Sequence, residues 1–223
     1  MSNLAYWKHF WGSQISPMHR YNSIEWYERY AVEINLLIKS LKYDFGPVLE
    51  SGCGNGALFD FLEVNKEGYT GVDISETMLA EFRKTHSNTT LYCSDAGSFF
   101  DKTKEFSLIF SNQCCQYFDF ETIGKYVLNS YQMLQSGGVL LIGNIPWKDN
   151  QPNFDSGELG RDISLFSFRK KISSILFKRG KKDSIGNWYN PRDFIGYQRS
   201  DFKISVFGSL FHPYRFSIAF KKG

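Results

Sequence analysis

Acidic residues and glycines stand where this chain could bind a nucleoside. Glu50 closes a short apolar run, and glycines follow at alternate positions, namely Gly52, Gly54 and Gly56. Glycine allows positive φ in a tight turn and lets the backbone approach a ligand closely. Asp73 ends the next apolar run, about twenty residues later, where nucleotide-binding folds place a ribose-binding carboxylate. The pattern therefore predicts a site for a nucleotide-like ligand.

An alternation of strands and helices has to position these residues. Short apolar runs predict five successive strands, over residues 48–51, 69–73, 90–93, 106–112 and 139–143. Periodicity and capping residues predict helices before and between them, over residues 24–42, 57–64, 76–86 and 122–135. Ser75 is the expected cap of the third helix, and Ser136-Gly137-Gly138 the expected stop of the fourth. This alternation predicts a parallel sheet with helices on both faces.

The pattern changes after residue 143. Residues 144–189 show no clean period and hold a basic cluster. Asn190-Pro191 predicts the cap and first turn of a short helix that runs to about Arg199. Two β-rich runs follow, 202–208 and 214–221. They must be antiparallel neighbours, because a parallel crossover needs about a dozen residues or more.

Composition narrows the class of protein. A chain of 223 residues can form one well-buried domain with room for an insertion. The net charge of +3 is too weak to indicate nucleic acid by itself. The four cysteines show no zinc spacing, so we predict no metal site and expect reduced thiols. We find no signal-peptide pattern and no apolar run long enough to cross a membrane, which favours a cytoplasmic protein.

Five segments of the chain together resemble a known family. They are Glu50-Ser51-Gly52-Cys53-Gly54-Asn55-Gly56, Val72-Asp73-Ile74-Ser75, Ser94-Asp95-Ala96, residues 106–112 and residues 134–142. Their order and spacing resemble the class I S-adenosylmethionine-dependent methyltransferases of the small seven-stranded type, over about residues 45–145, with the closing hairpin at 190–223. The resemblance implies an α/β fold, a Rossmann-like three-layer sandwich whose seven-stranded, mostly parallel sheet ends in an antiparallel C-terminal hairpin.

The resemblance also implies which residues bind S-adenosylmethionine, with S-adenosylhomocysteine as the product. Asp73 should accept hydrogen bonds from both ribose hydroxyls, and Asp95 should accept from the adenine amine. Glu50 should orient the loop and the cofactor's ammonium group. The full set of expected cofactor-binding residues is Glu50, Gly52, Gly54, Gly56, Asp73, Ile74, Asp95, Ala96, Asn112 and Gln113. Of these, Asn112 and Gln113 should face the sulfonium and the acceptor.

The implied reaction is direct in-line transfer of a methyl group, in which the protein mainly aligns donor and acceptor and excludes water. A hydroxyl acceptor also needs a base. The candidate bases are His19, Tyr21, Tyr117 and His212, although a solvated loop position is the default expectation for His212. An amine acceptor needs no dedicated base. The adjacent cysteines 114 and 115 are expected to pack as small apolar residues.

The acceptor is expected to depend on two distinctive segments. Residues 1–44 form an expected helical cap, and residues 45–223 the cofactor-binding domain with an insertion at about 145–190. The aromatic N-terminal segment suits a sugar or an apolar ring, which favours O-methylation of a small-molecule, sugar or glycan-type acceptor. Residues 165–182 mix apolar and basic residues, so they either pack on their own domain or lie peripherally on a membrane. Membrane contact would suit a lipid-linked or quinone acceptor.

Other readings of the sequence stay open at this point. A nicotinamide-dependent oxidoreductase shares the glycine turn and the second acid, but this turn is Gly-x-Gly-x-Gly and no Tyr-x-x-x-Lys pair occurs. A catalytically inactive protein that binds S-adenosylmethionine would keep the same residues, since fold does not prove activity. Nucleic acid is not favoured as an acceptor, because no Asn-Pro-Pro-Tyr-type motif follows the fourth strand. The acceptor atom and the oligomeric state are left open.

Overall fold

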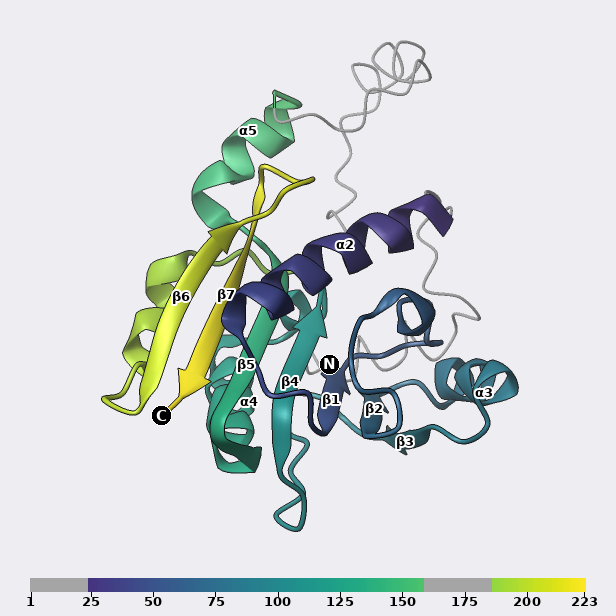
Figure 1. The fold of residues 1–223 in the computed structure, drawn as a ribbon. Helices are drawn as coiled ribbons and strands as arrows, with labels where there is room; N and C mark the ends of the chain where they lie inside the picture. Colours follow the sequence, from purple (N-terminus) through teal and green to yellow (C-terminus); the bar gives the residue numbers. More distant parts are fainter. Residues whose placement is uncertain (1–23, 159–185) are drawn as a thin grey trace.

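One seven-stranded sheet organises the residues that the computed structural model describes, 24–158 and 186–223 (Figure 1). Its strands, in chain order, are Val48–Ser51 (β1), Tyr69–Asp73 (β2), Thr90–Cys93 (β3), Phe106–Asn112 (β4), Leu134–Pro146 (β5), Phe202–Gly208 (β6) and Arg215–Lys222 (β7). Their order in the sheet is β3-β2-β1-β4-β5-β7-β6. β1 to β5 are parallel, and β7 runs antiparallel to both β5 and β6. The predicted fold, a mostly parallel α/β sheet with an antiparallel C-terminal hairpin, is confirmed.

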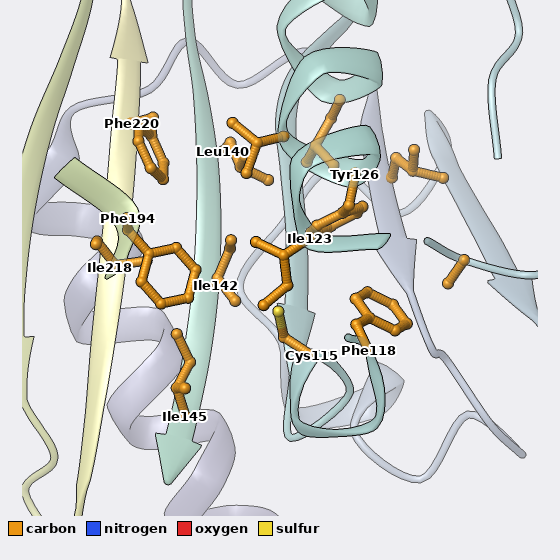
Figure 2. Packing of buried hydrophobic residues seen from close by; sticks show 14 of the residues in the cluster. Cys115, Phe118, Ile123, Tyr126, Leu140, Ile142, Ile145, Phe194, Ile218 and Phe220 are labelled. Atoms are coloured by element: carbon orange, nitrogen blue, oxygen red, sulfur yellow. The ribbon is translucent and has the colours of Figure 1, made fainter. Parts of the chain in front are cut away.

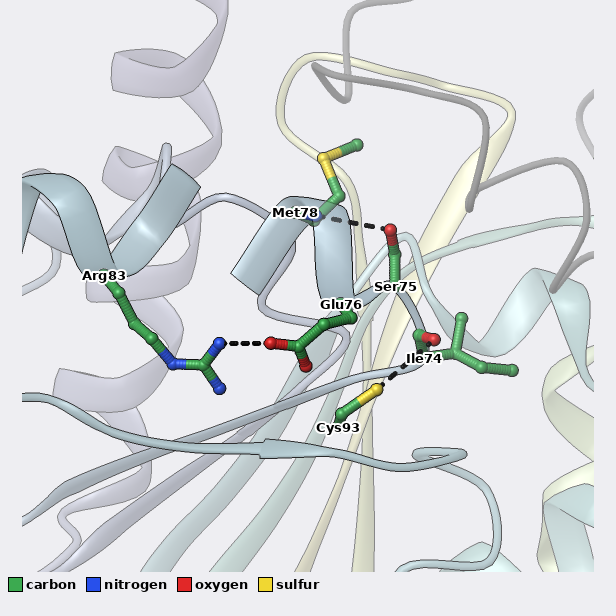
Figure 3. A network of polar contacts seen from close by, with 6 residues as sticks. All are labelled: Ile74, Ser75, Glu76, Met78, Arg83 and Cys93. Atoms are coloured by element: carbon green, nitrogen blue, oxygen red, sulfur yellow. Dashed lines mark hydrogen bonds and ion pairs between the residues drawn. The ribbon is translucent and has the colours of Figure 1, made fainter. Parts of the chain in front are cut away.

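Helices cover both faces of this sheet. The α-helices of the described residues are Ile24–Leu41 (α2), Glu76–Thr85 (α3), Phe120–Met133 (α4) and Gln151–Ser156 (α5). Short 3-10 helices span Phe59–Phe61 (η1), Cys115–Tyr117 (η2), Lys148–Asn150 (η3) and Pro191–Tyr197 (η4). Ser75 caps α3 as predicted, with its Oγ accepting from Met78 N at 3.3 Å (Figure 3). A reciprocal capping box of Asn190 and Asp193 begins η4.

Apolar residues alternate between two buried clusters, one on each face. On one face, Ile123 of α4 and Phe194 of η4 pack with the strand residues Leu140 and Ile142 (Figure 2). On the other face, α2 crosses the sheet and contributes buried residues such as Ile34 (Figure 1). Strands buried on both faces read as continuous apolar runs, which is why the bounds of β1 and β4 could be predicted. The predicted division into residues 1–44 and 45–223 stays a prediction.

The predicted helix over residues 57–64 is wrong, because this segment forms only the short 3-10 helix η1. The side chain of Asn35, from α2, makes hydrogen bonds to backbone groups of this segment that would otherwise bond within a helix. Its Nδ2 donates to the Phe61 carbonyl at 2.9 Å, and its Oδ1 accepts from Glu63 N at 2.9 Å. These backbone groups are satisfied from outside, so the chain leaves the helical path at Leu62, whose ψ is 134°.

The predicted glycine stop of the fourth helix is also wrong. α4 ends at Met133, and β5 begins at once with Leu134, so this strand is longer than predicted. Gly137 lies inside β5 at φ 77°, where the register against β4 shifts and the strand bulges. The helix end is satisfied from another strand instead, because Lys222 Nζ donates to the carbonyls of Tyr131 and Leu134, at 2.9 and 2.6 Å.

Adjacent lysines of β7 bind the ends of helices on opposite faces. Lys222 holds the end of α4, as described above. Lys221 Nζ donates to the Leu41 carbonyl at the end of α2, at 3.2 Å. Successive residues of a strand point to opposite faces, so one dipeptide satisfies carbonyls in both helical layers.

The predicted cofactor-binding residues lie at or just after the carboxyl ends of parallel strands, which meet at one edge of the sheet. Within the described ranges, no helix is both long enough and apolar enough to span a membrane. Three predictions lie outside the described residues, namely the candidate bases His19 and Tyr21 and the amphipathic segment 165–182.

Candidate active site

The turn after β1 uses its glycines in two different ways. Gly52, Gly54 and Gly56 all have positive φ, at 81°, 55° and 77°. A Cβ at Gly52 would lie 2.6 Å from Cys114 Sγ, and one at Gly56 would lie 2.5 Å from the Phe82 ring. A Cβ at Gly54 would meet no atom of the described residues within 4 Å. Two glycines therefore permit close packing, and the middle one is open with respect to the described part of the chain.

Asp73, the last residue of β2, is fixed to this turn by both carboxylate oxygens. Its Oδ2 accepts from Gly54 N at 2.9 Å, and its Oδ1 accepts from Ser75 N at 2.8 Å. Burial raises the pKa of this carboxyl, and these backbone donors oppose the rise. Each carboxylate oxygen keeps a further lone pair, so Asp73 can still accept from a ligand hydroxyl beside the open glycine.

Glu50 lies beneath the turn and is only 2% exposed. The Tyr69 hydroxyl, from β2, donates a hydrogen bond to its carboxyl group. Burial raises the pKa of Glu50 to about 7, against the effect of this hydrogen bond, and the nearby charge of Asp73 raises it further. A cationic ligand group above the turn would favour the ionised form.

The loop after β3 contains the other predicted acid. Asp95 accepts from Gly97 N at 3.1 Å and from Ser98 Oγ at 3.0 Å, so its side chain builds a local turn. The following residue, Ala96, is buried. Just before this loop, Cys93 Sγ at the end of β3 contacts the carbonyl of Ile74, the residue after β2, at 3.8 Å (Figure 3). A role for Asp95, Ala96 and Ile74 toward adenine and ribose stays a prediction.

The ends of β4 and β5 meet through side-chain amides. Asn144 Nδ2 donates to Asn112 Oδ1 at 2.9 Å. Gln113 has φ 55°, a strained conformation for a side chain of this kind, and its N–H donates to the Gly143 carbonyl at 3.1 Å. Among the described residues, its buried Nε2 has no hydrogen-bond partner, and neither does the buried Oδ1 of Asn55 in the glycine turn. Such unpaired polar atoms are expected where a polar ligand binds.

Two of the four candidate bases lie in the described part of the chain. Tyr117 ends η2, and burial raises the pKa of its phenol to about 12. His212 lies in the β6–β7 connection, and burial lowers the pKa of its imidazole to about 4, with a smaller effect from the charges of Arg215 and Arg29. The expected solvated position of His212 is wrong. The residue is 8% exposed, because its ring packs against the rings of Tyr30 and Tyr214.

Sequence reasoning missed a buried polar network beside these residues. Glu33 of α2 accepts from Ser209 Oγ at 3.0 Å, and Asn144 Oδ1 accepts from the same hydroxyl at 3.2 Å. Arg215, the first residue of β7, donates to Gln116 Oε1 at 2.9 Å and to the Asn144 carbonyl. One sequence signal was available, because Glu33 interrupts the apolar stripe of its helix.

Solved structures share this fold. A S-adenosylmethionine-dependent methyltransferase from Clostridium acetobutylicum ATCC 824 has 17% sequence identity and a TM-score of 0.62, with 100% of each chain covered. Magnesium protoporphyrin IX methyltransferase from Synechocystis PCC 6803 with bound S-adenosylhomocysteine has 13% identity and a TM-score of 0.64, again with 100% of each chain covered. At this identity the likeness concerns the fold alone.

The resemblance to class I S-adenosylmethionine-dependent methyltransferases that the sequence predicts is confirmed, because a methyltransferase-domain family model and solved methyltransferase structures both match this chain. Residues 48–138 match the family model described as a methyltransferase domain. A malonyl-[acyl-carrier protein] O-methyltransferase from Enterobacter lignolyticus (strain SCF1) is 32% identical over 96 residues. That alignment spans 43% of this chain and only 38% of the relative.

Proposed function

We propose that this protein transfers the methyl group of S-adenosylmethionine to an oxygen atom of a small-molecule or glycan-type acceptor. The observation that carries the proposal is the position of the Asp73 carboxylate, which is fixed by Gly54 N and Ser75 N beside an open glycine. A carboxylate held in this way can accept from two vicinal ribose hydroxyls. Because its acceptor geometry is set before binding, little ordering is needed when the nucleoside arrives.

The residues around the turn fit the rest of the cofactor. The unpaired Gln113 Nε2 can donate to a carboxylate, and the unpaired Asn55 Oδ1 can accept from an ammonium or a hydroxyl. A cationic amino acid group bound above the turn would favour ionisation of the buried Glu50 carboxyl beneath it, and the resulting negative charge would attract that group. When bound, the cofactor supplies a methyl group that is already activated. The contribution of the chain is then to hold the two reactants in line and to exclude water.

The alternatives differ in what supports them. The family match at residues 48–138 favours a methyltransferase over a nicotinamide-dependent oxidoreductase. The relative from Enterobacter lignolyticus is named as a malonyl-[acyl-carrier protein] O-methyltransferase, and the short alignment with it leaves the acceptor of this chain open. A membrane-surface acceptor rests on residues 165–182, which lie outside the described residues.

A calorimetric titration tests the cofactor first. We expect S-adenosylmethionine and S-adenosylhomocysteine to bind the full chain with micromolar dissociation constants, and a reduced nicotinamide not to bind. Binding of the nicotinamide alone would contradict the proposal. Cofactor binding should then be followed by a mass-spectrometric search for methylated products among sugars, phenols and carboxylic acids. Cofactor binding without turnover of any acceptor would favour the catalytically inactive alternative.

A further inference from the structure

Arg215 is a buried cation at the acceptor side of the sheet. It begins β7 and pairs with Pro146, the last residue of β5, and the whole residue is only 6% exposed. Its Nη1 donates to Gln116 Oε1 at 2.9 Å and to the Asn144 carbonyl. These two neutral acceptors fix the plane and direction of the guanidinium group.

The guanidinium forms no contact ion pair in the described part of the chain. No carboxylate oxygen of those residues lies within 4.0 Å of its nitrogens, and no acceptor from them pairs with its Nη2 or Nε. The buried Glu33 interacts with the charge of Arg215 across a longer distance, and hydrogen bonds join the two residues only through Ser209 and Asn144. A buried charge is stabilised most by an anion in direct contact with it, so the guanidinium can still bind an anion at its Nη2 and Nε.

The position of Arg215 links it to the methyl-transfer edge. Gln116 belongs to the turn after β4, and this turn starts at Cys114, which packs against Gly52. Asn144 contacts Asn112 at the end of β4. The guanidinium is therefore held by the two strand ends that face the expected acceptor. Its positive charge also reaches the candidate bases Tyr117 and His212.

Neither Tyr117 nor His212 is suited to removing a proton from an acceptor at neutral pH. The phenol of Tyr117, with a pKa of about 12, stays protonated and makes a poor base. The imidazole of His212, with a pKa of about 4, is neutral but only weakly basic. An acceptor that is already ionised needs neither of them.

We propose that the acceptor is a carboxylic acid, that Arg215 binds its carboxylate, and that an oxygen of this carboxylate receives the methyl group. This inference rests on the proposed function and names its acceptor class. A carboxylate oxygen forms the new O–CH₃ bond while the S–CH₃ bond breaks, and the electron pair of that bond stays on sulfur. The anionic acid and the cationic donor become a neutral methyl ester and a neutral thioether, so no proton is released.

Matched acids and amides test the proposal on the full chain. Malonate, succinate and benzoate are titrated calorimetrically into protein saturated with S-adenosylhomocysteine, beside malonamide, succinamide and benzamide. We expect at least one acid to bind about 30-fold or more tightly than its amide, the size expected for a buried charge pair. With S-adenosylmethionine, the same acid should yield its methyl ester. Equal binding of every acid and its amide, or no acid bound, would overturn the inference.

Variants at Arg215 locate the effect. Arg215→Gln should lose the acid preference about 30-fold or more and keep its affinity for S-adenosylhomocysteine, whereas Lys203→Gln, which removes an exposed cation from β6, should behave as the wild type. If Arg215→Gln does not fold, Arg215→Lys tests the inference instead. This variant keeps the positive charge but loses the planar guanidinium group, which can make two parallel hydrogen bonds to a carboxylate. It should still prefer acids but bind them more weakly, and unchanged affinity would contradict the inference.

The two proposals fail in different ways. A wild-type chain that does not bind S-adenosylhomocysteine would contradict the proposed function. A chain that binds it normally but treats acids and amides alike would contradict only the assignment of Arg215.

Discussion

The Tyr69 hydroxyl donates a hydrogen bond to the Glu50 carboxyl group and joins the first two strands beneath the glycine turn. The carboxyl is fully buried, and its pKa of about 7 lies well above the ordinary value of 4.5. Folded protein therefore keeps this proton up to about pH 7, whereas unfolded protein loses it near pH 4.5. The pair makes the stability of the domain depend on pH in a direction opposite to that of an ordinary surface carboxylate.

Glu50→Gln should remove this pH dependence. Between pH 4.5 and 7 the wild-type folded state binds more protons than the unfolded state, so its stability falls as pH rises, by about 3 kcal/mol in total. The free energy of unfolding of the variant minus that of the wild type should therefore increase by about 3 kcal/mol between pH 5 and pH 8. Urea titrations at four pH values measure the difference. Glu105→Gln, at an exposed position, is the control, and curves for Glu50→Gln that run parallel to the wild type would contradict the prediction.

Asp73→Ala should weaken cofactor binding by about 100-fold or more. The variant removes the carboxylate that we propose accepts from both ribose hydroxyls, and hydrogen bonds to a charged group contribute about 1.5–3 kcal/mol each. It also releases Gly54 N and Ser75 N. Calorimetric titration with S-adenosylhomocysteine gives the affinity, and Asp101→Ala, at an acid that contacts Thr103 in an exposed loop, is the matched control. Equal affinities for the two variants would refute the ribose assignment.

Alanine at two glycines of one turn should produce two different defects. Gly56→Ala places a Cβ 2.5 Å from the Phe82 ring at positive φ, so it should destabilise the fold by about 2 kcal/mol or more. Gly54→Ala has the same kind of backbone strain, but no atom of the described residues lies within 4 Å of the Cβ, so the variant should lose less stability and more cofactor affinity. Thermal unfolding and calorimetry on both variants separate the effects, and the reverse order would be inconsistent with an open middle glycine.

His212 should destabilise the fold in acid. Its pKa of about 4 lies below the ordinary value of 6.5, so the unfolded chain binds a proton in this window that the folded chain rejects. The contribution to stability is complete above pH 6.5 and falls by about 3 kcal/mol as pH drops toward 4. In urea titrations between pH 4 and 7, the free energy of unfolding of His212→Phe should therefore fall less with decreasing pH than that of the wild type. An equally steep fall in both proteins would show that other groups cause the loss of stability.

Local sequence determined most of the fold but not its exceptions. The bounds of β1 to β4 follow from short apolar runs that end in polar turns, and all four were predicted to the residue. The failed helix at 57–64 depends on Asn35, whose contacts cross more than twenty residues of chain. The end of α4 depends on Lys222, about ninety residues away. Local propensity carries no information about such distant partners.

The candidate site also has one part that could be predicted from local sequence and one part that could not. The glycine turn and Asp73 were predictable, because both follow strands at fixed spacing and contact each other. The network around Arg215 was not, because its hydrogen bond to Gln116 joins residues 99 positions apart. A lone arginine at the start of a strand carries no sequence signal of burial. Only the antiparallel return of β7 beside β5 places Arg215 next to Pro146, at the end of β5.

The neighbouring lysines of β7 have a consequence for how the protein is made. The carbonyl ends of α2 and α4 stay open to water until Lys221 and Lys222 have left the ribosome and β7 has entered the sheet between two strands already present. We therefore expect α2 and α4 to reach their final packing on the two faces of the sheet together, when β7 enters it. A nascent chain arrested before residue 221 should hold a loosely packed, protease-sensitive intermediate.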